Sequence, residues 1–144
     1  MQIEVLGTES LGVRGLSCVV KAKDRKIVID PGVALGYNRH GLLPHPLQVA
    51  VGETVRQKIL VALEDATDVV FSHFHGDHVP LVDANPYQMP AQKVAAVCQA
   101  RAKKPMFWAK GPRGLSHHMT SRAQSLRIAL DSDLANAEGQ NDGL

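Results

Sequence analysis

The chain has 144 residues, of which 44% are hydrophobic and 21% are charged, close to the average of soluble globular proteins. This length suits one domain, and this composition excludes a disordered or fibrous protein. Sixteen basic and fourteen acidic residues give a net charge of +2, which by itself indicates no polyanionic partner. The apolar runs are too short for a membrane-spanning helix, and the first residues lack the pattern of a secretory signal. We therefore expect a cytoplasmic protein without a membrane segment.

The first part of the chain predicts three strands, at residues 2–6, 16–23 and 26–30. The second and third strands are close enough to pair as a hairpin around the turn at Asp24 and Arg25. The segment Asp30-Pro31-Gly32 ends the third strand, because proline cannot donate to the ladder and glycine permits a turn. A long irregular stretch, residues 33–46, follows, and loops of this length are often functional.

The rest of the chain alternates between helices and strands. Apolar spacing predicts helices at residues 52–65 and 91–102, and a third that runs from a cap at Thr120 or Ser121 to Leu130. Short apolar runs predict strands at residues 68–72 and 106–109. This alternation indicates an α/β fold with an antiparallel start. We expect one domain over residues 1–130 and a flexible acidic tail over residues 131–144.

Basic residues are concentrated in the second half of the chain. Residues 84–130 contain no acidic residue and these eight basic ones: Lys93, Arg101, Lys103, Lys104, Lys110, Arg113, Arg122 and Arg127. The stretch fits solvated helix faces, or a positive field that gathers phosphorylated substrates or RNA. Only 4% of residues are aromatic, so stacking platforms for single strands are scarce and the support for RNA is weak.

Four potential metal ligands lie within six positions, in the sequence His73-Phe74-His75-Gly76-Asp77-His78. Residues two apart on an extended segment face the same way, so His73 and His75 can converge on one ion. Gly76 allows the backbone to turn and to present Asp77 and His78 to a second ion. A closed structural zinc site would normally use cysteine, and Cys18 and Cys98 lie far away in apolar stretches where we expect core packing. The motif therefore favours a catalytic metal site.

The His-x-His-x-Asp-His loop after a buried strand resembles the hallmark of the metallo-β-lactamase superfamily. The segments Gly7-Thr8-Glu9-Ser10 and Ile27 to Gly32 resemble strand ends that precede this motif in the superfamily. The opening residues and the segment Gly41-Leu42-Leu43-Pro44-His45-Pro46-Leu47 resemble most an archaeal branch of it. The resemblance covers roughly residues 1–130. It implies a four-layer αββα sandwich, of which this chain would form the N-terminal half: a β-hairpin start and a mixed sheet flanked by helices.

The resemblance also implies a role for each matching residue. His73 and His75 would bind one metal and Asp77 and His78 the other, while Asp30 would steady the motif loop without touching metal. Two zinc ions, or iron or manganese, would hold a hydroxide that attacks an ester, amide or phosphodiester bond, with Asp77 as the catalytic residue that orients it. The substrate would be a small or phosphorylated molecule.

Two metals need more ligands than this motif provides, and the superfamily takes them from a later half of the sandwich. His117 and His118 are the later histidines here, and they are candidates for metal or substrate contact. His40 and His45, in the long loop, could line the mouth of the site.

Three accounts of the chain remain open from the sequence. It is the N-terminal portion of a longer metal-dependent hydrolase, or a half-domain completed by another chain or by a second copy of itself, or a metal-binding or regulatory module without catalysis. As a truncated chain, the hydrolase would be inactive if the missing ligands are essential.

Overall fold

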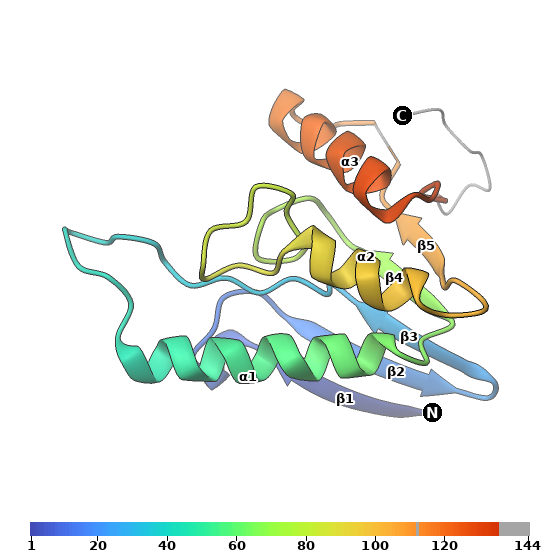
Figure 1. Cartoon of the computed structure of the whole chain (residues 1–144), viewed down its shortest axis with the longest axis horizontal. Helices are drawn as coiled ribbons and strands as arrows, with labels where there is room; N and C mark the ends of the chain where they lie inside the picture. Colours follow the sequence, from blue (N-terminus) through green and yellow to red (C-terminus); the bar gives the residue numbers. More distant parts are fainter. Residues whose placement is uncertain (112, 136–144) are drawn as a thin grey trace.

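The computed structural model describes residues 1–111 and 113–135, which form one five-stranded sheet and its helices (Figure 1). The strands β1 (Gln2–Gly7), β2 (Ser17–Ala22), β3 (Arg25–Ile29), β4 (Asp68–Phe71) and β5 (Met106–Ala109) lie side by side in chain order. β1, β2 and β3 pair antiparallel, whereas β3, β4 and β5 pair parallel. The predicted hairpin and the mixed sheet are therefore confirmed.

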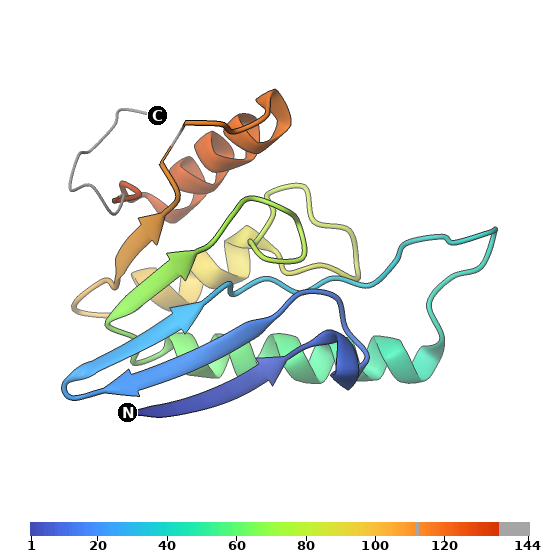
Figure 2. The same cartoon turned by 180° about the vertical axis from the view of Figure 1, so that it is seen from behind.

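Two helices, α1 (Pro46–Leu63) and α2 (Ala91–Gln99), cover one face of this sheet, and a third helix, α3 (His117–Leu130), packs against α2 (Figure 1). Seen from behind, the sheet stands in front of α1 and α2, and its other face is open (Figure 2). α1 connects β3 to β4 and α2 connects β4 to β5. Because crossovers between parallel strands are right-handed and these two advance in the same direction, both helices reach the same face. Within the described residues, none of the helices combines the length and the apolar character needed to cross a membrane.

The strand register explains the difference between the two faces. On the covered face a row of paired residues is buried, consisting of Val19, Val28, Val69 and Phe107. The neighbouring row on the open face is apolar too, and its members are exposed or half-buried: Val5, Cys18, Ile29, Val70 and Trp108. The described residues thus form one helical layer and one sheet, an α/β arrangement that agrees with the N-terminal half of the expected sandwich.

The two cysteines lie in different surroundings. Cys98 is buried in the core, and this burial raises the pKa of its thiol to about 11. Cys18 is half-buried on the open face rather than in the core, and burial, with a smaller contribution from Asp30, raises its pKa as well. Both thiols are free and protonated at neutral pH, so neither is a reactive nucleophile.

Four helix boundaries differ from the sequence prediction, and one of them is the end of α1, which lies at Leu63 rather than at residue 65. α1 begins at Pro46 rather than at residue 52, because the His45 ring accepts a hydrogen bond from the backbone N–H of Leu47 and proline suits the first helical position. α3 begins at His117, because Ser116 caps it, and not Thr120 or Ser121. α2 ends at Gln99, three residues before its predicted end.

The chain continues its fold past Leu130. Asp131 ends α3 in a left-handed conformation, and Leu134 is 8% exposed. Ala135 forms a parallel bridge with Trp108, through hydrogen bonds with the backbones of Phe107 and Ala109. Residues 131–135 therefore belong to the folded part rather than to a flexible tail, and residues 136–144 of the expected tail lie outside the described residues.

Candidate metal centre

The histidine motif lies at the carboxyl end of β4, directly after Phe71 and Ser72. Asp30 follows the neighbouring strand β3 at the same edge of the sheet. Parallel strands place their carboxyl ends side by side, so two segments more than forty residues apart in the sequence meet here. This edge is where open α/β sheets commonly place their sites.

The structure brings the four motif ligands together. The ring of His73 lies 4.8 Å from that of His75 and 4.1 Å from that of His78, measured between ring centroids. An Asp77 carboxylate oxygen lies 3.7 Å from Nε2 of His78. Phe74, between the two histidines of the strand end, is buried in the core and anchors the loop. The loop therefore presents imidazole and carboxylate donors in one cluster.

Asp30 holds this cluster in place. One of its carboxylate oxygens accepts the backbone N–H of Ser72 at 2.7 Å, and the other accepts the Ser72 hydroxyl at 2.5 Å. The second oxygen also lies 2.9 Å from Nδ1 of His78. Asp30 is 4% exposed and has a positive φ of 50°, a conformation that aspartate adopts more readily than most residues. With Nδ1 engaged, His78 offers Nε2 to a ligand, as metal-bound histidines commonly do.

The donor set fits a transition metal. Asp30, His73 and His78 each offer one ligand atom, and these atoms lie within 4.8 Å of one another. Two ligands of one zinc ion, each at about 2.1 Å, stand at most about 4.2 Å apart, so a small side-chain adjustment suffices. Imidazole suits zinc and iron, and carboxylate also suits manganese. The geometry at this edge is therefore suited to binding zinc, iron or manganese.

The charge state of His73 favours metal binding. Burial lowers the pKa of its ring, the neighbouring His78 and His75 lower it further, and the carboxylates of Asp30 and Asp77 oppose this. The net shift keeps His73 neutral at neutral pH. A neutral imidazole has the free electron pair that a metal ion requires.

Two glycines outside the motif, Gly15 and Gly32, support it by close contact. A side chain at Gly15 would place its Cβ 2.0 Å from the backbone oxygen of Asp77, and one at Gly32 would lie 2.3 Å from the carbonyl carbon of His78. Real atoms do not approach so closely, so both positions require glycine. In the sequence, each glycine stands next to the end of a predicted strand. This position does not reveal its contact with the motif, which lies far away in the chain.

Arg122 of α3 connects the third helix to the motif. Its guanidinium donates a hydrogen bond of 3.3 Å to the backbone oxygen of Phe74. His118 lies one helical turn earlier on the same side of α3, since residues four apart share a helix face. His117 and His118 are both exposed at the start of this helix. The structure therefore places His118 on the motif side of α3 and gives neither histidine a direct contact with the cluster among the described residues.

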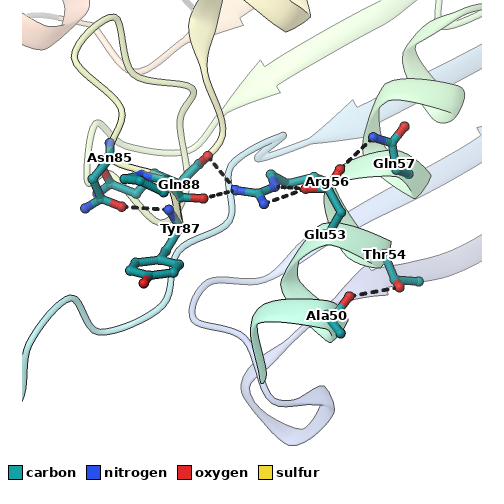
Figure 3. A network of polar contacts seen from close by, with 9 residues as sticks. Ala50, Glu53, Thr54, Arg56, Gln57, Asn85, Tyr87 and Gln88 are labelled. Atoms are coloured by element: carbon teal, nitrogen blue, oxygen red, sulfur yellow. Dashed lines mark hydrogen bonds and ion pairs between the residues drawn. The ribbon is translucent and has the colours of Figure 1, made fainter. Parts of the chain in front are cut away.

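Arg56 of α1 holds the loop that returns past the motif (Figure 3). Its guanidinium donates to the backbone oxygens of Pro86 and Gln88, at 2.6 and 3.2 Å, and it pairs with Glu53 one turn earlier. The Gln88 side chain lies 3.3 Å from the position that a Cβ on Gly76 would take. The α1 helix thus supports the far side of the motif through one arginine.

His40 and His45 serve other parts of the fold. His45 caps α1 with its ring. His40 lies in a tight two-residue turn between Arg39 and Leu42, whose backbones exchange two hydrogen bonds of 3.0 Å. The expected irregular stretch therefore contains a small hairpin, and among the described residues neither histidine contacts the cluster.

The basic stretch is partly used by the fold. Arg101 donates to the backbone oxygens of Leu63 and Ala66, Arg122 to that of Phe74, and Lys104 pairs with Asp131. These positive charges hold neighbouring segments together, which weakens the case for a nucleic-acid surface.

Comparison with known proteins agrees with this fold and site. The family profile described as "Metallo-beta-lactamase superfamily" matches residues 12–82, which include the Asp30 segment and the whole histidine motif. Residues 12–82 therefore match the metallo-β-lactamase superfamily.

The chain is also similar to archaeal proteins named UPF0282. It is 47% identical to the UPF0282 protein of Methanosarcina mazei over 96% of its own length and 44% of that protein, which confirms the archaeal resemblance. It is 37% identical to the UPF0282 protein of Pyrobaculum calidifontis, over 91% of the chain and 42% of the relative. The chain spans less than half the length of these relatives, and no solved structure matches it.

Proposed function

We propose that this chain carries the metal-binding half of a metal-dependent hydrolase that cleaves an ester, amide or phosphodiester bond. The observation that supports it is the joint placement of three histidines and an aspartate beside a buried carboxylate at one sheet edge. Structural zinc sites seldom use such a set without cysteine. Catalytic zinc sites keep a position for water and use histidine and carboxylate ligands.

Each residue of the cluster has a role in this proposal. His73 and His75 would hold one metal, and Asp77 with Nε2 of His78 a second. Asp30 is close enough to share an ion with His73 and His78, but its bond to Nδ1 gives it the role of orienting His78 in this proposal. When bound, zinc lowers the pKa of water to about 7 and thereby supplies a nucleophile at neutral pH. The Asp77 carboxylate would accept a hydrogen bond from that water and set its direction of attack. His117, His118 and His45 stay candidates for substrate contact, with His118 favoured by its side of α3.

A second candidate function is a metal-binding or regulatory module without catalysis. The number of available ligands favours it. The described cluster has five members, and one of them, Asp30, already bonds to another, His78. Two metals need about six protein ligands. A half-domain that a partner chain or a second copy completes would have the same cluster, and the open apolar sheet face agrees with such a partner. A small-molecule or phosphorylated substrate and a cytoplasmic location stay predictions.

Metal content and hydrolysis, measured together, test the proposal. We expect one or two zinc ions per chain, and hydrolysis of bis(4-nitrophenyl) phosphate or of a thioester that His75→Ala abolishes. Asp65→Ala is the matched control, because Asp65 pairs with Lys26 away from the motif and its loss should leave both quantities unchanged. Metal without hydrolysis would support the binding module, and the absence of metal after purification in zinc would contradict both candidates.

A further inference from the structure

A cavity of about 570 Å³ is lined by segments on both sides of the β2–β3 hairpin in the sequence. Its lining comes from the turn after β1 and from the segment between β3 and α1, with Arg14, Arg39 and Glu9 as its charged members. Val13 and Leu35 line it as well, and both are buried. We call this cavity the arginine pocket.

The two arginines of the pocket differ from the arginines that serve the fold. Several guanidinium groups bond to neighbours, at Arg25, Arg56, Arg101 and Arg122. Among the described residues, Arg14 and Arg39 have no carboxylate within 4.0 Å and no side-chain hydrogen bond. Two cationic groups on a concave surface, each without an internal partner, point to an anionic ligand.

The backbone holds Arg39 in place over the pocket. A Cβ on Gly36 would lie 2.8 Å from Nε of Arg39, so the arginine side chain lies across this glycine. The two hydrogen bonds between the backbones of Arg39 and Leu42 close the turn that carries it. Positive φ angles at Asn38, His40 and Gly41 give the turn its shape. The guanidinium is therefore presented by a defined hairpin.

The lining also indicates how much charge and apolar surface the ligand carries. Two guanidinium groups against the Glu9 carboxylate leave the lining with one net positive charge, which suits a single anionic group. Leu42 and Leu43 line the same cavity and are 72% and 63% exposed, so an apolar body bound there would cover them.

The pocket is connected to the metal loop by short segments. Arg14 directly precedes Gly15, which packs against the backbone of Asp77. The backbone of Arg14 also pairs with that of Ala34. Leu35 follows Asp30 by five residues, at most about 17 Å of extended chain. A molecule held in the pocket by one end would therefore need to span at most about this distance to pass from Leu35 to Asp30.

We propose that the arginine pocket binds the anionic head of an organic phosphate or carboxylate, and that this head belongs to the substrate of the metal site. The second part rests on the proposed function, whereas binding of the anion does not. The pocket would anchor the substrate away from the bond that is cleaved, so its loss raises KM more than it lowers kcat.

The test is a titration of this chain, without added metal, with phenyl phosphate and with benzoate, followed by backbone amide NMR. We expect shifts in residues 9–14 and 35–44, a Kd raised about tenfold by Arg14→Gln or Arg39→Gln, and no change with Arg127→Gln, which removes the same charge from α3. The tighter of the two probes identifies the head group as phosphate or carboxylate. Circular dichroism verifies that the variants fold, which the exposure of both arginines leads us to expect.

The outcomes separate this inference from the proposed function. If neither probe shifts these amides, or if Arg127→Gln weakens binding equally, the pocket is not an anion site. If the probes bind and His75→Ala keeps their affinity while no hydrolysis is found, the anion site stands and the hydrolase does not. If hydrolysis is found and Arg14→Gln leaves KM unchanged, the pocket does not hold the substrate.

Discussion

Two buried carboxylates lie at opposite ends of the same pair of parallel strands, and they have opposite kinds of partner. Asp68 begins β4 and is 1% exposed, and Asp30 follows β3 and is 4% exposed. Asp68 accepts hydrogen bonds from Arg25 at 2.7 Å, from Thr67 at 2.6 Å and from Trp108 at 2.8 Å. A full positive charge and two neutral donors thus satisfy it within the fold.

Among residues 1–111 and 113–135, no such cation pairs with Asp30. Its partners are Ser72 and the ring of His78, and that ring is itself a candidate metal ligand. The comparison teaches that burial of a carboxylate does not by itself mark a site. The two differ in their partners. Arg25 neutralises the charge of Asp68, whereas Asp30 keeps its charge and binds a histidine ring that belongs to a cluster of metal-type donors.

We expect the largest effect from removal of Asp68, the carboxylate that is neutralised within the fold. Asp68→Ala leaves the indole N–H of Trp108 without its acceptor and the Arg25 guanidinium without its counter-charge, whereas the Thr67 hydroxyl can still donate to the backbone oxygen of Lys26. We expect a loss of about 2–3 kcal/mol in the free energy of unfolding, measured in urea. Asp65→Ala is the control, because its carboxylate is 72% exposed and its pair with Lys26 should be worth under about 0.5 kcal/mol. Equal losses in both variants would contradict the structural role of Asp68.

The second largest effect is expected from Asp30, the carboxylate beside the histidine motif. Asp30→Asn keeps the shape and tolerates the positive φ, but removes the charge that orients His78. We expect zinc affinity, measured by competition with a chelating dye, to fall about 10- to 100-fold. Asp68→Asn should leave it within about twofold, and an equal loss in both would remove the distinction between the two carboxylates.

A comparison of two glycines, Gly12 and Gly15, tests the contact between Gly15 and the motif. Gly12 and Gly15 have similar positive φ angles, 84° and 90°, but a Cβ at Gly12 meets only Val51 at 4.0 Å. We expect Gly12→Ala to cost about 1 kcal/mol of stability through backbone strain alone. Gly15→Ala should cost a further ~1–2 kcal/mol, because it displaces the backbone of Asp77, and should weaken zinc binding too. Urea unfolding and the same zinc competition measure both, and equal stability losses would contradict the contact.

The smallest expected effect is the pH dependence of the Asp68 contribution. Burial alone would raise the pKa of Asp68, but the hydrogen bonds from Arg25, Thr67 and Trp108 outweigh it and hold the pKa below its ordinary value of 3.8. A carboxyl group with a lowered folded pKa stabilises the fold above the unfolded value and loses this contribution as the pH falls. The stability difference between the protein and Asp68→Asn should therefore be constant near neutrality and shrink below about pH 4. A difference that grows on acidification would refute this sign.

Features carried by neighbouring residues were predictable from the sequence. The strand at Met106–Ala109 has its predicted bounds, because an apolar run between polar and loop-forming residues defines it locally. The histidine motif was recognisable because its ligands lie within six positions, close enough for one turn to bring them together. The early start of α1 was missed because its cap is the ring of His45, and histidine is not one of the usual capping residues. The early start of α3 was missed because Ser116, Thr120 and Ser121 can all cap a helix, and the sequence does not say which side chain reaches the backbone.

The sequence by itself determined the order of strands and helices, the resemblance to one superfamily, and the donor set of the metal loop, since each depends on residues close together in the chain. Only the tertiary structure decided that Asp30 reaches His78, that Asp68 is neutralised by Arg25, and that Gly15 touches Asp77. Those contacts join segments about forty or more residues apart. The first two contacts depend on the parallel pairing of β3 with β4, which no local pattern encodes. The arginine pocket also joins separate segments, because the chain before β2 and the chain after β3 form it.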